Sequence, residues 1–455
     1  MINVKQIISS VLIVGACLSP LTLPVIVQPS WAQSPNSVIQ EVQRLLQQAT
    51  QQGQQGQHKQ VIETLQQVLA LARPLKDRQL EAFVLLGIAF NYRNISQPQE
   101  ALKYYNQALP MMREVGDRRG EAATLNNIGA VYLRISQPQE ALKYFNQALP
   151  IRREVGDRSG EAITLTNIGE VYQSISQPQE ALKYLNQALP MMRELGASRG
   201  EAATLHNIGA VYRSIYQPQE ALKYYNQALP MMREVGDRAG VATTLTNIGA
   251  VYHSIHQPQE TLKYYNQALP ITRSVGDRAG VATILNNIGA VYLRISQPQE
   301  ALKYYNQALP IARSVGDRTM EGTTLNNIGT VYHTISQPQE ALKYYNQALP
   351  IARSVGNRSG EATTLDNIGE VYRSISQPQE ALKYYNQALP ITRSVGDRSG
   401  EAATLSHIGL VYNSISQPQE ALKYYNQALV IAREIGDRTL EATILDSIKA
   451  VNKTN

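Results

Sequence analysis

The stretch that decides the fold runs from Arg118 to Asp157 and reads RRGEAATLNNIGAVYLRISQPQEALKYFNQALPIRREVGD. It recurs every 40 residues in fixed register, so that a glycine returns at one position of each copy. We call such a set of equivalent positions a slot. The glycine slot holds Gly129, Gly169, Gly209, Gly249, Gly289, Gly329, Gly369 and Gly409. A period in this range is typical of a solenoid.

Two helical patterns fill each repeat. The apolar positions of the first are Ala122, Leu125, Ile128, Gly129, Tyr132 and Ile135. Those of the second are Ala141, Leu142, Phe145, Ala148, Leu149 and Val155. The spacing in both is helical, so each segment is expected to be a helix with one apolar side. Neither helix can bury that side alone, and stacked pairs are therefore expected to form the core.

The residues between the patterns predict where the helices begin and end. Ser136 followed by Gln139 has the spacing of a capping box, with Pro138 tolerated in the first turn. Gly156 is expected to close the second helix in a left-handed conformation, and Asp157 to cap the next helix.

Prolines inside the second helix conflict with this pattern, because an interior proline costs about 3 kcal/mol. They occupy one slot, at Pro110, Pro150, Pro190, Pro230, Pro270, Pro310, Pro350 and Pro390. Their regular recurrence predicts a repeated kink on the outer face, with the freed carbonyl of Asn146 turned toward water in its repeat.

The motif resembles the tetratricopeptide repeat family. The resemblance lies in the spacing Leu125-x2-Ile128-Gly129-x2-Tyr132, followed by Ala141-x3-Phe145 and Ala148. The usual unit has 34 residues, and the longer unit here is similar to Pins/LGN-type, kinesin-light-chain-type and cyanobacterial repeats. The resemblance implies an all-α, right-handed α-solenoid superhelix of about ten helix pairs plus a C-terminal capping helix.

Residues 1–32 are interpreted as a secretory signal peptide. Lys5 precedes an apolar run, and Ser30-Trp31-Ala32 offers a cleavage site before Gln33. Export to a periplasm, lumen or extracellular space is therefore expected, without stable membrane insertion after cleavage. The alternatives are a membrane anchor, or a lipoprotein processed at Cys17, the only cysteine.

The repeats divide the rest of the chain. Residues 33–77 form a degenerate N-terminal capping repeat, in which Gln48 and Gln52 replace apolar residues and the segment from Gln51 to Gln60 is expected to be a loop. Nine regular repeats follow over residues 78–437. Residues 438–455 are expected to be a lone C-terminal capping helix, with Lys449 in the glycine slot.

Composition argues against several functions. The formal net charge is +6 but is spread as mixed pairs, so no nucleic-acid partner is predicted. His253 and His256 lie three residues apart without a third metal ligand. No nucleophile elbow or nucleotide-binding glycine pattern occurs. We therefore predict no enzyme activity, no metal and no cofactor.

Buried slots hardly vary between repeats, whereas one side of the first helix does. The Asn126 slot also holds Thr166, His206, Thr246, Asn286, Asn326, Asp366 and Ser406. The Leu133 slot includes Arg213, His253 and Arg373, and the Ala130 slot includes Glu170 and Glu370. We expect this side to be concave and to bind a partner. Drift of an unconstrained surface is the alternative.

A column of asparagines on the same side does not vary until His407 interrupts it. Its members are Asn127, Asn167, Asn207, Asn247, Asn287, Asn327 and Asn367. A side-chain amide can pair with the backbone of an extended peptide of any sequence, as asparagines of the resembled families do at this position. Alternatively, each asparagine bonds only the adjacent helix.

These observations predict a non-enzymatic scaffold that binds an extended peptide or a partner protein in its groove. The alternative is a regulatory or sensor array that works with a separate effector such as a caspase-like protease, as in similar cyanobacterial proteins. A repeat fold alone does not decide between them.

Overall fold

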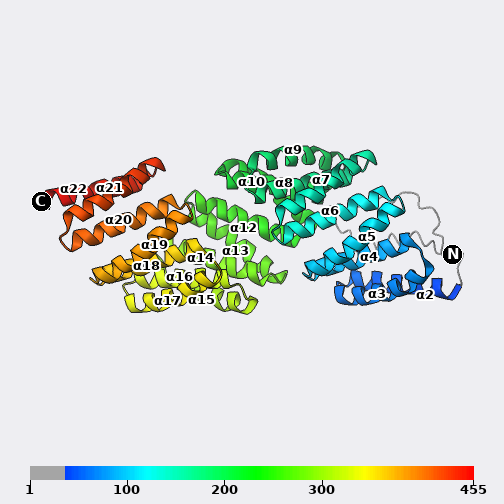
Figure 1. The fold of residues 1–455 in the computed structure, drawn as a ribbon, viewed down its shortest axis with the longest axis horizontal. Coiled ribbons are helices and arrows are strands. Elements are labelled where there is room, and N and C mark those ends of the chain that lie inside the picture. Colours follow the sequence, from blue (N-terminus) through cyan, green and yellow to red (C-terminus); the bar gives the residue numbers. More distant parts are fainter. Residues whose placement is uncertain (1–35, 455) are drawn as a thin grey trace. The chain divides into compact units, whose positions relative to one another are not determined.

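The computed structural model describes residues 36–454, which form 21 helices (Figure 1). The predicted signal peptide, residues 1–32, lies outside the described residues. The chain divides into two compact bodies between Thr244 and Leu245, within helix α12 (Arg238–Ser254). We call them the N-terminal and the C-terminal body, and each is described by itself.

Each repeat consists of a first and a second helix. The first helices are α2 (Asn36–Gln54), α4 (Arg78–Asn94), α6 (Arg118–Arg134), α8 (Arg158–Ser174), α10 (Ser198–Ser214), α12, α14 (Arg278–Arg294), α16 (Arg318–Thr334), α18 (Arg358–Ser374), α20 (Arg398–Ser414) and α22 (Arg438–Thr454). The second helices are α3 (His58–Leu75), α5 (Pro98–Glu114), α7 (Pro138–Glu154), α9 (Pro178–Glu194), α11 (Pro218–Glu234), α13 (Pro258–Ser274), α15 (Pro298–Val315), α17 (Pro338–Ser354), α19 (Pro378–Ser394) and α21 (Pro418–Glu434). Within residues 36–454, ten pairs thus precede a single helix, which confirms the predicted all-α tandem array.

The turn inside each repeat differs from the predicted capping box. Ser136 adopts a left-handed conformation with φ 59°. Its N–H donates to the carbonyl of Leu133 at 3.0 Å, and the N–H of Gln137 donates to that of Tyr132 at 2.9 Å. The second helix begins at Pro138, with Gln137 at the N-cap and no side-chain cap bond. The capping-box prediction is therefore wrong, because this serine closes the first helix and does not open the second.

The turn between repeats follows the prediction. Gly156 has φ 65°, which glycine adopts without steric cost. The side chain of Asp157 accepts a hydrogen bond from the N–H of Gly160 at 3.0 Å and caps α8. The predicted loop from Gln51 to Gln60 is too long, however, because α2 continues to Gln54 and α3 begins at His58. Glutamine is a good helix former, so a glutamine-rich sequence does not by itself end a helix.

The two helices of a repeat approach closely at the glycine slot. A Cβ on Gly129 would lie 2.7 Å from the ring of Phe145, so a larger residue would force the helices apart. Beside this contact, the rings of Tyr132 and Tyr144 stack with centroids 5.4 Å apart. Leu125 and Ile128 are fully buried in the same cluster. The apolar sides predicted for both helices therefore form a core within each body.

The second helices continue through their interior prolines. Helix α7 contains Pro150, which is exposed, and the helix ends only at Glu154. The residue whose carbonyl loses its helical donor, Asn146, is exposed as well. Water can therefore hydrogen-bond that carbonyl, which explains why proline is tolerated in this slot.

Candidate partner-binding surface

The Asn126 slot lies between the first helices of successive repeats. Asn126 and Thr166 are each only 8% exposed, and Asn286 is 6% exposed. In these repeats the slot does not belong to an open binding face, contrary to the expectation from its variability. Its variation instead changes how one first helix contacts the next.

Some members of the asparagine column brace neighbouring repeats. The amide nitrogen of Asn167 donates to Oδ1 of Asn126 at 3.2 Å, and the hydroxyl of Thr164 donates to the same oxygen at 3.1 Å. The same amide-to-amide bond, also 3.2 Å long, joins Asn327 to Asn286 and Asn367 to Asn326. For these three asparagines the structure shows the contact to the adjacent helix.

Other members of the column make no such bond. Within residues 36–454, no side-chain hydrogen bond joins Asn127, Asn207 or Asn287 to another repeat, and all three are half-buried. The Asn126 slot of the preceding repeat holds Leu86, Thr166 and Thr246, respectively. The amide-to-amide bond therefore forms where that slot holds asparagine, whose Oδ1 accepts from the column. Asn247, in contrast, has an interaction partner.

His407 occupies the column position next to an acidic residue. Its Nδ1 lies 3.0 Å from Oδ2 of Asp366, and the hydroxyl of Thr404 donates to Oδ1 at 2.9 Å. Burial alone would lower the pKa of His407, but the hydrogen bond and the charge of Asp366 outweigh it and raise that pKa. This pair links α18 to α20 in place of an asparagine pair.

The predicted binding residue Arg373 is engaged within its own helix. Its Nε donates to Oε2 of Glu370 at 2.8 Å, and the hydroxyl of Tyr385 donates to the same carboxylate at 3.0 Å. Burial would raise the pKa of Glu370, but the hydrogen bond and charge of Arg373 lower it. Arg373 therefore neutralises a half-buried carboxylate and is not a freely available cation.

The other two candidates, Arg213 and His253, differ in exposure. Arg213 is exposed on α10, whereas His253 is half-buried and burial lowers its pKa. On the same helix as Arg213, Nδ1 of His206 lies 2.8 Å from the hydroxyl of Thr244. Burial, with a smaller contribution from Arg213, lowers the pKa of His206 to about 4. His206 is therefore neutral near pH 7.

The sequence also contains a size relationship between two slots, which is not visible when each slot is compared alone. Where a second helix ends and the next first helix begins, two residues eight positions apart face each other; we call each such pair a junction. A Cβ on Gly120 would lie 2.6 Å from Sδ of Met112, so the methionine fills the space that glycine leaves.

Residue sizes at the junctions compensate for each other. A long side chain precedes glycine at Met112–Gly120, Arg152–Gly160, Met192–Gly200 and Met232–Gly240. Alanine precedes a long side chain at Ala72–Leu80, Ala312–Met320 and Ala432–Leu440. Threonine precedes glycine at Thr272–Gly280 and Thr392–Gly400. At Ala352–Gly360 both residues are small.

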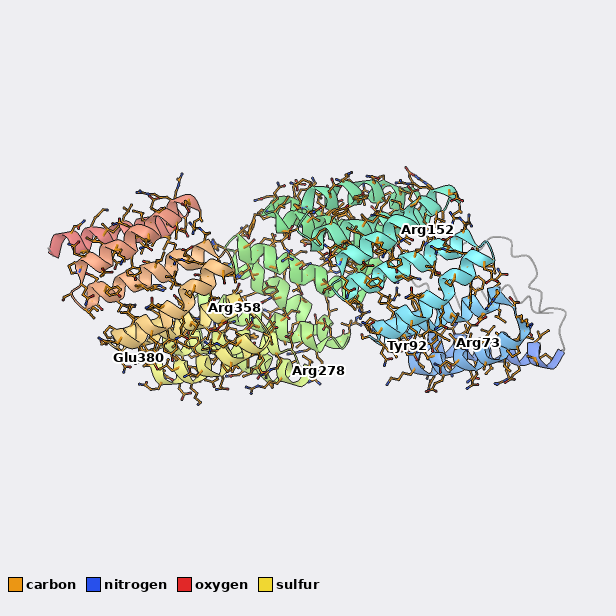
Figure 2. All side chains as sticks on the ribbon, viewed as in Figure 1. Arg73, Tyr92, Arg152, Arg278, Arg358 and Glu380 are labelled. Carbon is orange, nitrogen blue, oxygen red and sulfur yellow. The ribbon has the colours of Figure 1, made fainter. Side chains whose placement is uncertain are left out.

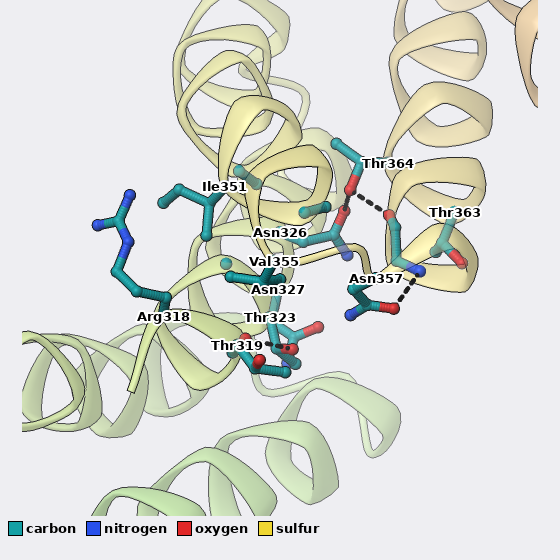
Figure 3. Close-up of a pocket in the computed structure, with 14 residues that line it drawn as sticks. Arg318, Thr319, Thr323, Asn326, Asn327, Ile351, Val355, Asn357, Thr363 and Thr364 are labelled. Atoms are coloured by element: carbon teal, nitrogen blue, oxygen red, sulfur yellow. Dashed lines mark hydrogen bonds between the residues drawn. The ribbon is translucent and has the colours of Figure 1, made fainter. Parts of the chain in front are cut away.

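A pocket of about 220 Å³ opens at the Ala352–Gly360 junction (Figure 3). Ala352 is 7% exposed there, whereas the equivalent Ala312 and Ala432 are completely buried. The pocket lies between α16, the end of α17 and the start of α18, and Asn326 and Asn327 contribute to its lining. One bonded member of the asparagine column thus adjoins a cavity.

The described residues contain no group of three or more His, Cys, Asp or Glu side chains that could hold a metal ion. None of the helices in that part of the chain is both long and apolar enough to cross a membrane.

The geometry defines a tandem α-helical repeat protein, built from helix pairs that contact their neighbours. Sequence comparison gives the family: the tetratricopeptide repeat model matches residues 42–114, 120–194, 160–234, 200–274, 240–314, 280–354 and 320–394. The chain belongs to the tetratricopeptide repeat family. A model of anaphase-promoting complex subunit 5 also matches residues 379–454. A search of curated proteins finds no match.

Solved structures share the fold at low sequence identity. The apo quorum sensor NprR from B. thuringiensis has a TM-score of 0.59 and 17% identity, over 78% of this chain and 98% of that one. A signal-transduction ATPase of the STAND class with a tetratricopeptide repeat sensor, from Pyrococcus horikoshii, has a TM-score of 0.62 and 15% identity. That match covers 83% of this chain and 57% of the other. A Rap protein complexed with Competence and Sporulation Factor has a TM-score of 0.54 and 14% identity, over 79% of this chain and 98% of that one. The family supports a protein-interaction or regulatory scaffold, and these neighbours share its fold.

Proposed function

We propose that the protein is a non-catalytic scaffold whose asparagine column binds the backbone of an extended segment of a partner protein. One observation carries this proposal: Asn127, Asn207 and Asn287 are half-buried residues of the first helices, and their amides make no side-chain hydrogen bond within residues 36–454. Each amide offers two donors and one acceptor. A peptide backbone has the complementary groups, so these side chains can bind it without selecting a sequence.

The bonded asparagines provide a matched control for this proposal. Asn167, Asn327 and Asn367 occupy the same slot but use an amide proton to hold the preceding repeat. Replacing the first set with alanine should therefore remove contacts to the partner, and replacing the second should remove contacts within the array. Both changes delete amides from one slot.

The experiment compares the triple variant N127A/N207A/N287A with the double variant N167A/N367A, which spares Asn327 because that residue lines the pocket at the Ala352–Gly360 junction. The partner is first recovered by pull-down with the full chain and identified by mass spectrometry. Each hydrogen bond is worth about 0.5–1.5 kcal/mol, so the triple variant should weaken affinity by roughly a hundredfold, with Tm almost unchanged. The double variant N167A/N367A should lower Tm more than affinity. Unchanged affinity in N127A/N207A/N287A would refute the proposal.

A regulatory array is the second candidate. Structural similarity to a quorum sensor, a Rap protein and a tetratricopeptide repeat sensor favours it. In that case the partner would be a separate effector, such as a caspase-like protease, whose activity depends on the array. Measuring the activity of any co-purifying enzyme with and without the protein distinguishes a regulator from a passive scaffold.

We also propose export, with cleavage after Ala32 and no stable membrane insertion of the mature protein. The support is the apolar run after Lys5 and the site Ser30-Trp31-Ala32 in the sequence. Mass spectrometry of the native protein should find Gln33 at the N-terminus. Retention of Met1, or a lipid on Cys17, would contradict cleavage at this site.

A further inference from the structure

The Ala352–Gly360 junction lacks a side chain that other junctions contain. Opposite the equivalent glycines, Met112 and Met192 fill the space, and both are buried. In the remaining alanine junctions the partner residue is long, as at Ala312–Met320. Only here, among the described repeats, do alanine and glycine meet, and the pocket of about 220 Å³ opens at this junction.

Part of the pocket lining is apolar, and the rest consists mainly of threonines and asparagines. Ala348, Ile351 and Ala352 from α17 form the apolar part together with Val355, and Gly322 of α16 completes the wall. Arg318 lies at the margin, but its guanidinium already pairs with Glu321. The pocket therefore suits an uncharged, apolar side chain, because a buried charge would lack a partner.

Two asparagines in the lining retain unused hydrogen-bonding groups. Oδ1 of Asn326 accepts from Thr364 and from Asn367, which leaves its amide N–H groups available. The amide nitrogen of Asn327 donates to Asn286, which leaves its Oδ1 available. One donor and one acceptor thus lie beside the apolar part of the pocket, which is the arrangement that a peptide backbone with an apolar side chain requires.

We propose that this pocket binds an unbranched apolar side chain, of about the size of methionine, from an extended segment of a partner protein. The side chain occupies the space that Met112 and Met192 fill in their own junctions, and Asn326 and Asn327 pair with the backbone beside it. This inference rests on the proposed partner-binding function and adds an apolar anchor to it. It also places the anchor in the C-terminal body.

The test uses the full chain and the probe acetyl-Gly-X-Gly-amide, where X is a photoreactive diazirine analogue of methionine. Irradiation followed by mass spectrometry should find crosslinks on Ile351 and Val355. Excess acetyl-Gly-Met-Gly-amide should suppress them, and acetyl-Gly-Asp-Gly-amide should not. Equal suppression by both peptides, or crosslinks spread over all repeats, would overturn the proposal.

A substitution that fills the pocket with a side chain of the protein itself provides the decisive variant. A352M recreates the methionine–glycine junction that the fold already contains, so it should fold with an equal or higher Tm and reduce crosslinking at least tenfold. A352T, which copies the Thr392–Gly400 junction, should give an intermediate loss. T392M makes the same kind of change one repeat further on and should leave crosslinking unchanged. Full crosslinking in a folded A352M or A352T would refute the proposal.

The outcomes separate the two proposals. If A352M no longer crosslinks to the probe but N127A/N207A/N287A keeps full affinity for the partner, the pocket binds the apolar side chain. The proposal that the asparagine column binds the partner backbone is then wrong. If the triple variant loses the partner while A352M retains both probe and partner, the column binds and the pocket does not.

Discussion

Two neighbouring junctions of the N-terminal body fill the same space with opposite chemistry. A Cβ on Gly120 would lie 2.6 Å from Sδ of Met112, and a Cβ on Gly160 would lie 2.5 Å from Cζ of Arg152 (labelled in Figure 2). Both long side chains are buried. One is an apolar thioether and the other is a guanidinium that pairs with Asp157.

The difference indicates that a junction requires volume more than a particular chemistry. Met112 has no polar atom that needs a partner. Arg152 gains the ion pair, but its Nε is buried without a hydrogen-bond partner in the described residues. Desolvating such a group costs free energy that the ion pair only partly offsets. We therefore expect stability to follow the filled volume first and the electrostatics second.

The largest effect on stability is expected from removing the buried side chain that fills a junction. M112A would convert the junction into an alanine–glycine pair, as at Ala352–Gly360. Loss of the buried side chain and the resulting cavity should lower the free energy of unfolding by about 2–4 kcal/mol. Urea denaturation followed by circular dichroism measures it. M112R is the matched comparison and should cost less, because Arg152 occupies the same space. Equal losses in both variants would contradict the volume argument.

A smaller effect on stability, of opposite sign, is expected from replacing the charged side chain of Arg152 with an uncharged one. R152M keeps the volume and removes the buried guanidinium. Asp157 keeps its capping bond to the N–H of Gly160, as Asp117 does beside Met112. Unfolding free energy should rise by about 1–2 kcal/mol. R152A, which also opens a cavity, should instead lower it. A lower urea midpoint for R152M would show that the ion pair outweighs its desolvation.

The sequence predicted the helix pairs because the apolar slots recur with helical spacing in copy after copy. It did not predict the turn at Ser136, because serine is common both at N-caps and in left-handed turns, and only the backbone angle distinguishes them. The compensation at the junctions could have been found, since Met320 and Leu440 replace glycine where Ala312 and Ala432 precede them. Such a pattern needs two slots to be compared together.

The candidate site was harder to predict because it depends on contacts between repeats. The bond from Asn167 to Asn126 spans 41 residues and requires the register of α6 against α8. An identical asparagine therefore braces the array in one repeat and is available in another, as Asn207 is. Identity within a column cannot distinguish these roles. The residue in the preceding repeat does distinguish them.

The smallest effect on stability is expected beside the Thr272–Gly280 junction, where the buried glutamate of most repeats is missing. In most repeats a buried glutamate accepts hydrogen bonds from two arginines. The side chain of Glu121, only 5% exposed, accepts one from Nε of Arg113 at 2.7 Å and one from a guanidinium nitrogen of Arg118 at 2.5 Å. In the repeat that begins at Arg278, Val281 takes its place. A second pocket, of about 210 Å³, lies beside Val281 and includes Arg273 and Arg278 in its lining (Figure 2 labels Arg278).

V281E should complete this ion-pair group and raise the free energy of unfolding by about 0.5–1 kcal/mol. The gain is small because both arginines are exposed and water screens the attraction. Differential scanning calorimetry should show a slightly higher Tm, and the gain should shrink as salt is added. V281Q, which has the shape without the charge, should show little or no gain. If V281Q and V281E stabilise equally at low and high salt, filling of the pocket and not charge explains the effect, and volume would again be the dominant requirement.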